Sequence, residues 1–258
     1  MFHLLKEVRK NWELIWALAI KELRIRYKRS TLGFLWSLLN PLLMMVILTV
    51  VFSTIMPLPL HHYAVFLISA LLPWTFLAQA LAYGAESIVL NGDLLKKVYI
   101  DKAVFPVAAV LSNIINFLLS LLPLVLLLVC LRFPFYWTWV YLPVSLIGLV
   151  MFTLGCAFFC AAANVFFRDV SHILQIVLSA WFYVSPIIYS LDFIPQKYRF
   201  LFLLNPMLYI LDGFRHAIYY GSLPSQQSIA LSLAIGIATL IVGYAFFRRW
   251  QDRFVYYV

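Results

Sequence analysis

Few side chains in this sequence form a pattern that could carry out a reaction. The glycine-rich phosphate loop GxxxxGK[ST] does not occur, so the chain has no evident means of binding ATP by itself. His61 and His62 are neighbours expected to be solvated, and Cys156 and Cys160 lie one helical turn apart, as small packing residues do. No Ser/His/Asp arrangement or pair of carboxylates is visible. The sequence therefore predicts no catalytic residue, no metal site and no cofactor bound by this chain.

Positive charge is the one chemical feature that is concentrated in a short stretch. Five cations lie between residues 21 and 29, and the next charged residue is Glu86. The cations directly precede a long apolar run, as Lys and Arg do at the cytoplasmic end of membrane helices. This reading explains much of the net charge of +9 without nucleic acid as a partner.

Composition places the chain in the membrane. Its 258 residues are 65% hydrophobic and 11% charged, with a mean hydropathy of +0.96. Soluble domains are roughly half apolar and about one quarter charged. We therefore expect an all-α integral membrane protein, whose length leaves no room for a separate soluble domain beside several spans.

The expected spans are apolar runs of about 20 residues, the length of helix that crosses a hydrocarbon core. Six such runs lie near residues 33–56, 65–90, 104–131, 140–166, 172–191 and 227–247. Membrane-spanning strands are excluded, because the stretch 118–131 lacks their alternation of polar and apolar residues. Residues 31–258 are thus expected to form one transmembrane domain.

The distribution of Lys and Arg predicts the orientation. The N-terminal segment, the loops after the second and fourth spans, and the C-terminal tail together hold 15 of the 19 Lys and Arg residues. Cytoplasmic segments carry this excess. Both termini are therefore expected to be cytoplasmic. The six expected spans agree with this, because an even number of spans leaves both termini on the same side.

Residues 1–30 are expected to form an amphipathic helix in the membrane interface. One face of the helical wheel holds Trp12, Trp16, Ala19, Ile20, Leu23 and Tyr27. The opposite face holds Lys10, Glu13, Lys21, Arg24 and Lys28. Periodicity alone does not separate a simple lipid anchor from a surface that also docks a partner or admits substrate.

Residues 192–224 are too long and too aromatic for a simple loop. Their apolar pieces are broken at Asn205-Pro206, and neither piece is long enough to cross a bilayer. Irregular backbone at membrane depth requires protein or a water-filled cavity to satisfy its polar groups. We expect a re-entrant pair of short helices on the external side, with a peripheral external cap as the alternative.

Aromatic residues make up 17% of the chain. Many must belong to the interfacial belts of the membrane. Others, on interior helix faces, would stack on sugar rings without strong directional hydrogen bonds, as a sliding polymer requires. The candidates are Phe34, Trp36, Trp74, Tyr83, Trp181, Phe182 and Tyr183.

Three stretches carry a family resemblance that covers nearly the whole chain. They are KELRIRYKRSTLGFLWSLLNPLLMM, NGDLLKKVYIDKAVFP, and FFRDV followed by WFYVSPIIYSLDFIP and LNPMLYILDGFR. Together they resemble ABC-2 type permeases of the polysaccharide-export branch, which move O-antigen, capsule or wall teichoic acid precursors out of bacteria. Where the family often has Pro followed by Arg-Glu, this chain has Asp101-Lys102-Ala103, a departure that concerns the shape of that loop and not the resemblance.

The resemblance implies six spans, a homodimer, and two copies of a separate cytoplasmic ATPase that binds the ATP and Mg²⁺. Contact with the ATPase would fall on a coupling helix and on the N-terminal segment, through Asp93, Leu94, Lys96, Lys97, Tyr99, Lys21 and Glu22. Arg24 and Arg26 would flank that contact. The external gate would involve Pro186, Asn205 and Pro206. The clustered cations gain a second role, binding the diphosphate of a lipid carrier at the cytoplasmic opening, with Arg24, Arg26, Lys28 and Arg29 as candidates.

The predicted function is that of the permease subunit of an ATP-driven exporter in the bacterial inner membrane, moving a polysaccharide linked to a polyprenyl diphosphate. O-antigen is the favoured cargo, with capsule, teichoic acid and small-molecule export as alternatives in the same class. A membrane enzyme that transfers polymer from the same lipid carrier is the alternative from another class. It would need an exposed catalytic acid or base, and the only acids expected on the external side are Asp192 and Asp212.

Overall fold

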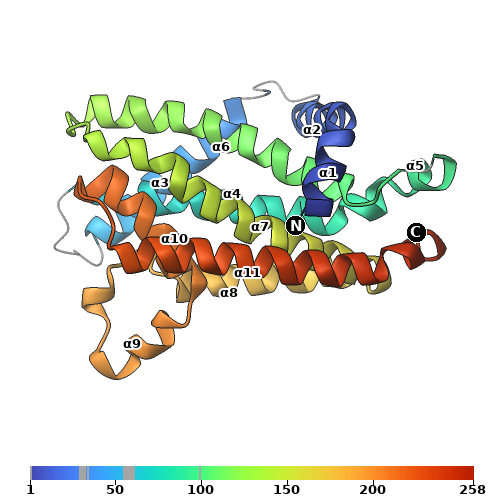
Figure 1. Cartoon of the computed structure of the whole chain (residues 1–258). Coiled ribbons are helices and arrows are strands. Elements are labelled where there is room, and N and C mark those ends of the chain that lie inside the picture. The colour runs from blue at the N-terminus through green and yellow to red at the C-terminus, as the bar shows by residue number, and fades with distance from the viewer. Residues whose placement is uncertain (1, 29–32, 34, 55–61, 99) are drawn as a thin grey trace.

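The computed structural model describes residues 2–28, 33, 35–54, 62–98 and 100–258, and within these residues it contains helices and no strands. The all-α prediction is therefore confirmed (Figure 1). The α-helices are α1 (Phe2–Lys10), α2 (Trp12–Tyr27), α3 (Leu35–Thr54), α4 (Tyr63–Leu90), α5 (Gly92–Lys97), α6 (Val104–Cys130), α7 (Leu142–Phe166), α8 (Val170–Val184), α9 (Gln196–Leu203), α10 (Pro206–Arg215) and α11 (Gln226–Trp250). Shorter turns are η1 (Trp137–Tyr141), η2 (Leu191–Phe193), the π-helical η3 (His216–Tyr220) and η4 (Gln251–Tyr256).

Within the described part of the chain, four helices are long and apolar enough to cross a membrane. They are Tyr63–Lys97, Val104–Cys130, Trp137–Phe166 and Gln226–Tyr256, and each includes one of the predicted spans or nearly coincides with it. Of the remaining two predicted spans, 33–56 corresponds to α3, whereas 172–191 runs past the end of α8 at Val184 into irregular backbone. The predicted end of that span was wrong because Pro186 disfavours helix at the residue before it. The apolar parts of these two helices among the described residues are shorter, at Leu42–Val51 and Val170–Val184.

Helix α4 forms the centre of the bundle. It is apolar over most of its surface, as a helix is when lipid or other helices surround it. Its stretch from Val65 to Leu72 is almost completely buried, and it packs against α3, α6, α7, α8 and α10. Pro73 lies inside the helix, where neighbouring helices and the preceding turn can accommodate the missing backbone donor.

Helices α7 and α11 form the closest pair, because glycines line their contact. A methyl group added to Gly148 would approach Oγ of Ser232 to 2.8 Å, and one added to Gly243 would overlap the backbone carbonyl of Gly155. Gly236 makes a similar approach to the backbone of α7. Small residues at intervals of two turns allow two membrane helices to pack backbone against backbone. The pair is therefore a stiff element that runs the length of the bundle.

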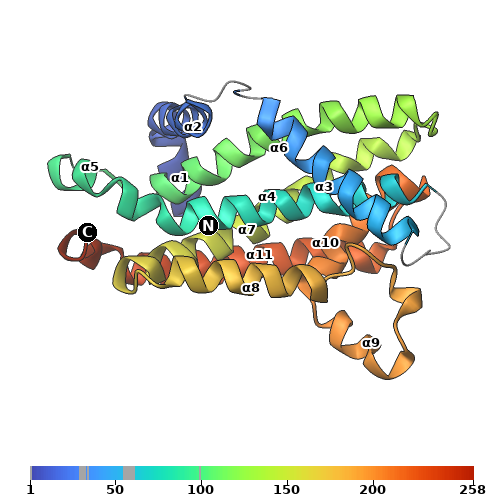
Figure 2. The same ribbon diagram turned by 180° about the vertical axis from the view of Figure 1, so that it is seen from behind.

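The two ends of the bundle carry different elements. Helices α1, α2 and α5 and the C-terminal residues lie at one end, whereas α9 and η3 lie at the other (Figures 1 and 2). Helix α9 buries no side chain and projects sideways from the bundle, whereas α10 packs against α4, α7 and α11. The predicted coupling and gate elements are thus separated by the length of the spans.

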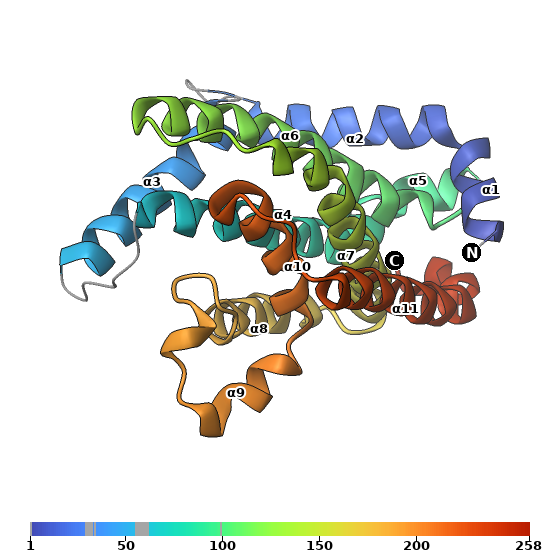
Figure 3. The same cartoon turned by 60° about the vertical axis from the view of Figure 1, so that its left-hand side comes forward.

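The N-terminal segment forms two helices, in place of the single helix predicted for residues 1–30. Helix α1 ends at Lys10 and α2 begins at Trp12, and Figure 3 shows the two set at a steep angle. The side chain of Asn11 donates a hydrogen bond of 3.1 Å to the carbonyl of Glu7. Asn side chains that bond nearby backbone in this way compete with helix continuation, which accounts for the break.

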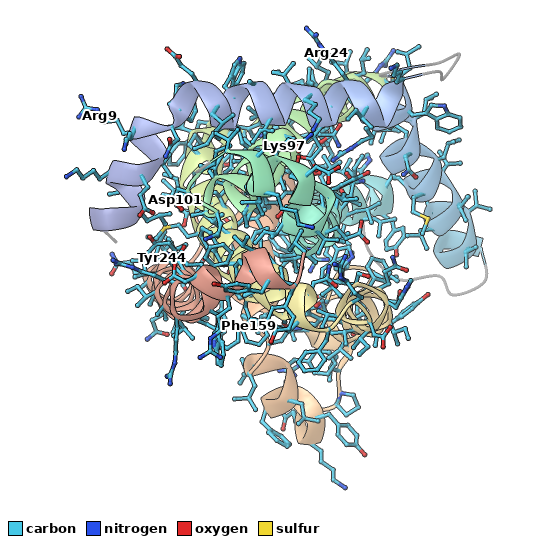
Figure 4. All side chains as sticks on the ribbon, turned by 90° about the vertical axis from the view of Figure 1, so that its right-hand side faces the viewer. Arg9, Arg24, Lys97, Asp101, Phe159 and Tyr244 are labelled. Carbon is cyan, nitrogen blue, oxygen red and sulfur yellow. The ribbon has the colours of Figure 1, made fainter. Side chains whose placement is uncertain are left out.

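Helix α2 also has a side that faces protein, which the predicted wheel lacked. The wheel placed Ala19 with the tryptophans on the lipid side, but Ala19 and Ile15 are fully buried. Ile15 packs on α6, whereas Trp12 and Trp16 remain 49% and 46% exposed. The prediction of one lipid-facing side and one water-facing side was wrong because a third side of α2 packs against helix α6. Figure 4 shows α2 lying across the end of the bundle.

Candidate functional site

Helix α5 presents charge outward from an apolar base. Asp93 occupies its first turn and Lys96 and Lys97 its last, which is the arrangement that a helix dipole favours. The side chains of all three are exposed, whereas Leu95 is buried and Leu94 is partly buried. Tyr99, the remaining residue predicted for this contact, lies outside the described residues.

Helix α2 is connected to the start of α5 by a hydrogen bond. Nζ of Lys21 donates to Oδ1 of Asn91 over 3.3 Å, and the amide of Asn91 donates to the carbonyl of Ser87 in α4 over 2.8 Å. Lys21 and the charged residues of α5, which lie far apart in sequence, therefore share one end of the molecule.

Residues 254–258 pack beneath α5. Phe254 is fully buried in the same apolar cluster as Leu95, and a methyl group added to Gly92 would overlap the side chain of Val258. The carbonyl of Tyr257 accepts a hydrogen bond of 3.1 Å from Arg168, in the turn between α7 and α8. The C-terminal residues therefore connect α5 with α11 and with the turn after α7.

Arg26 turns inward, toward α4 and α6. The carbon at the centre of its guanidinium lies 3.9 Å from the centre of the Tyr83 ring, a cation–π distance. Its Nη1 donates to Oδ1 of Asn113 over 3.2 Å. Tyr83, predicted as a channel aromatic, is thus brought together with a cation predicted to bind diphosphate.

Glu22 lies one turn before Arg26 on the same side of α2. Its carboxylate accepts a hydrogen bond of 3.0 Å from Ser112 in α6. Burial raises the pKa of Glu22 above the usual 4.5, against the opposing influence of the Ser112 hydrogen bond and of the positive charges of Arg26 and Lys21. The predicted coupling residue Glu22 therefore contacts the bundle.

The other candidates for diphosphate binding are arranged differently. Arg24 and Lys28 are exposed, and Figure 4 shows Arg24 pointing away from the bundle. Together with Trp16 and Lys21 they line an open depression on the outer side of α2. Arg29 lies outside the described residues. The cluster is therefore divided between an inward cation and outward cations.

Four of the predicted channel aromatics meet between α4 and α8. The ring of Trp74 lies 5.7 Å from that of Trp181 and 5.8 Å from that of Phe182, and Phe182 contacts Tyr183 at 5.3 Å. A cavity of about 400 Å³ lies beside them, and the polar side chains of its lining are Asn40, Thr75, Gln79 and Ser179 in addition to Tyr183. Trp36 is 45% exposed at the start of α3, and Phe34 lies outside the described residues.

The predicted gate is held by the side chain of Asn205, which is 6% exposed. Its Oδ1 caps α10 by accepting from the backbone N–H of Met207 over 3.0 Å. The same oxygen accepts a hydrogen bond of 2.9 Å from the indole N–H of Trp181. The side-chain nitrogen of Asn205 donates a hydrogen bond of 3.0 Å to Oγ of Ser185. Pro206 begins α10 at a position where its missing donor costs nothing.

Two buried side chains hold the segment that follows Pro186. Arg215 donates from Nη2 to the carbonyl of Ile187 over 2.7 Å and lies 3.9 Å over the ring of Phe66. Tyr63 donates to the carbonyl of Ile188 over 2.9 Å. Irregular backbone thus finds its partners inside the protein, as membrane-depth backbone must.

Sequence reasoning missed several of these partners. Ser112 and Asn113 lie in an apolar run, where two adjacent polar residues signal an interhelical contact. Asn91 begins the stretch NGDLLKKVYIDKAVFP, and nothing in that stretch predicts its bond with Lys21. The burial of Arg215 had no signal beyond its place in an apolar segment.

Comparison with known proteins places the chain in a family. The sequence pattern of the ABC-2 type transporter family matches residues 13–219. The chain is 34% identical over 258 residues to the O-antigen export system permease protein RfbA of Myxococcus xanthus, covering 98% of each chain. It is 31% identical over 244 residues to an RfbA of Klebsiella pneumoniae, covering 94% of each, and 24% identical over 244 residues to the polysialic acid transport protein KpsM of Escherichia coli, covering 92% of this chain and 93% of KpsM. The protein is therefore a member of the ABC-2 type transporter family.

Proposed function

We propose that this protein is the permease subunit of an ATP-driven exporter that moves an O-antigen polysaccharide, carried on a polyprenyl diphosphate, across the bacterial inner membrane. The observation that carries the proposal is the match over nearly the full length, at 30–34% identity, to relatives named as O-antigen export permeases. The outward charge of α5 adds support, because a permease that does not itself bind ATP needs a docking surface for its motor.

In this proposal a homodimer of the permease binds two copies of a cytoplasmic ATPase. The ATPase subunits bind the ATP and Mg²⁺ and hydrolyse the ATP. The exposed Asp93, Lys96 and Lys97, together with Lys21, form the central part of the docking surface. Both termini lie in the cytoplasm in this proposal, which the excess of Lys and Arg in the N-terminal segment and the C-terminal tail supports. Helices α3 and α8 complete a set of six spans.

The polymer path runs from the cations of α2 to the gate. Arg24, Arg26, Lys28 and Arg29 receive the diphosphate at the cytoplasmic opening, where charge-assisted hydrogen bonds favour it. The aromatic cluster of Trp74, Trp181, Phe182 and Tyr183 offers ring faces to sugars. The short helices α9 and α10 form the external gate, hinged at Asn205 and Pro206, and Pro186 loosens the end of α8.

Capsule export is the second candidate. It is favoured by the match to KpsM of Escherichia coli, a polysialic acid transport protein, which extends over 92% of this chain. The lower identity of that match, 24% against 34%, places O-antigen first.

Charge reversal at α5 tests the docking surface. Lys96→Glu with Lys97→Glu is expected to abolish export and to release the ATPase, while insertion in the membrane persists because both side chains are exposed. The matched control is Arg248→Glu with Arg249→Glu, which makes the same change of charge at two adjacent exposed residues in the last turn of α11. Export that survives the α5 change, with the ATPase still bound, would remove α5 from the docking surface.

A further inference from the structure

A cavity of about 410 Å³ separates α2 from α4 and α6. Charged and polar side chains line one part of it, from Lys21, Glu22, Arg26 and Asn91. Apolar side chains line the rest, among them Ile25 and Phe105. A cavity that combines a cation-lined part with an apolar part suits an amphiphile with an anionic head.

The guanidinium of Arg26 has hydrogen-bonding capacity left over beside this cavity. Nη1 is bonded to Asn113, but Nε and Nη2 are buried and have no partner among the described residues. A buried donor without a partner is unfavourable, because the hydrogen bond that it gave up to water is not replaced. Such a cost is removed if a ligand supplies the missing acceptor.

The two unpartnered nitrogens form one edge of the guanidinium. Nε–H and the outer N–H of Nη2 point in parallel, and this edge is the one that binds two oxygens of a carboxylate or phosphate at once. The ring of Tyr83 lies against the flat face of the same group, 3.9 Å from its central carbon. That contact leaves the edge as the direction in which a further ligand can bind.

Other charges around the cavity suit a phosphate better than a carboxylate-bearing protein segment. Lys21 adds a second cation on the wall of the cavity. Glu22 is the single acid in the lining, and its carboxylate is engaged by Ser112. Because Nε and Nη2 are buried, the ligand reaches them once the Arg26 side chain turns toward the cavity that it already lines.

We propose that Arg26 holds a phosphate oxyanion in this cavity through its Nε–Nη2 edge, with Lys21 as the second cation and the apolar wall receiving the start of a hydrocarbon chain. The assignment of that oxyanion to a lipid diphosphate rests on the proposed function. Arg26 thereby differs from Arg24 and Lys28, which are exposed and do not line this cavity. Their charges attract the phosphate to the surface of α2.

The test is binding of farnesyl diphosphate to the purified full-length chain in nanodiscs, measured without ATPase. Arg26→Gln is expected to weaken binding at least tenfold, and Arg26→Lys to weaken it nearly as much, because Lys keeps the charge but lacks the edge. The matched control is Arg9→Gln, an exposed cation of α1 that does not line the cavity, with an expected change of less than threefold. Thermal unfolding of each variant confirms that the fold is retained.

Two further probes identify the source of the phosphate. Inorganic diphosphate is expected to bind more weakly than farnesyl diphosphate, because it does not use the apolar wall. Phosphatidylglycerol vesicles that compete with farnesyl diphosphate as well as unlabelled farnesyl diphosphate does would assign the site to a bilayer lipid. Equal effects of the Arg9 and Arg26 variants would overturn the site itself. Since export is not measured, these outcomes are separate from a failure of the proposed function.

Discussion

The indole nitrogen of Trp181 donates a hydrogen bond of 2.9 Å to the side-chain oxygen of Asn205. One atom thereby joins an aromatic residue of α8 to the N-terminus of α10, where the same oxygen also caps the helix. The aromatic cluster and the start of α10 are therefore joined directly, and the two should respond together to substitution.

Asn205→Ala is expected to destabilise the protein by roughly 1 to 3 kcal/mol, since it removes the cap and leaves the part-buried indole N–H of Trp181 without its acceptor. Thermal unfolding in mild detergent measures the effect. Trp181→Phe removes the same hydrogen bond but keeps a ring, so the double variant should lose less than the sum of the two single losses. Strictly additive losses would show that the bond contributes nothing.

Arg215→Met is expected to cost about 3 kcal/mol or more, because it leaves the carbonyl of Ile187 unpaired and removes the cation from the face of Phe66. In a background without Cys130, Cys156 and Cys160, a cysteine introduced at Ser190, in the segment after α8, should then react faster with a thiol reagent applied at the end of the bundle that carries α9. Lys197→Met, in α9, removes a cation at the same end of the molecule and should change neither stability nor accessibility. A stable, inaccessible Arg215 variant would contradict the assigned role.

Stability should depend on pH through Glu22. Because burial raises the pKa of this carboxyl in the folded state, its neutral form favours folding. The contribution is fully present below the usual pKa of 4.5 and is lost as the pH rises through the raised value. The unfolding temperature of the wild type, relative to that of Glu22→Gln, should therefore rise as the pH is lowered from neutral toward 4.5. Parallel pH profiles for the two proteins would exclude this role, and Glu13→Gln, exposed on the same helix, serves as the control.

Gly92→Ala should disturb α5 because the added methyl overlaps Val258. Overpacking of this kind costs about 1 to 3 kcal/mol, and the displaced residues 254–258 would no longer support α5. Val258→Ala in the same chain removes the overlapping methyl groups and should therefore reverse the effect of Gly92→Ala. Val258→Ala alone should have little effect. ATP hydrolysis per polymer exported is the readout in the complex. A double variant as impaired as Gly92→Ala would show that Val258 does not set the position of α5.

The sequence was sufficient for the long helices, because apolar length alone predicts them. It also predicted the break at Asn205-Pro206, since Pro cannot continue a helix from the preceding turn. It did not predict that α2 packs against the bundle, because a helical wheel cannot tell an apolar side facing lipid from one facing protein. The same limit explains why Arg26 was grouped with Arg24: only the contacts with Tyr83 and Asn113 separate them.

The pairing of Lys21 with Asn91 shows a second limit. The two residues are 70 positions apart, and no local pattern relates them. Their contact depends on how α2 lies across α4 and α6, which is a property of packing.

The most direct test of the central claim is transport by the affinity-purified full-length chain, reconstituted in proteoliposomes with whatever ATPase co-purifies. The account predicts that an ATPase with a phosphate loop is recovered with the chain, and that lipid-linked O-antigen reaches the opposite leaflet only while ATP is hydrolysed. Movement of the glycan by the permease alone, without nucleotide, would contradict it.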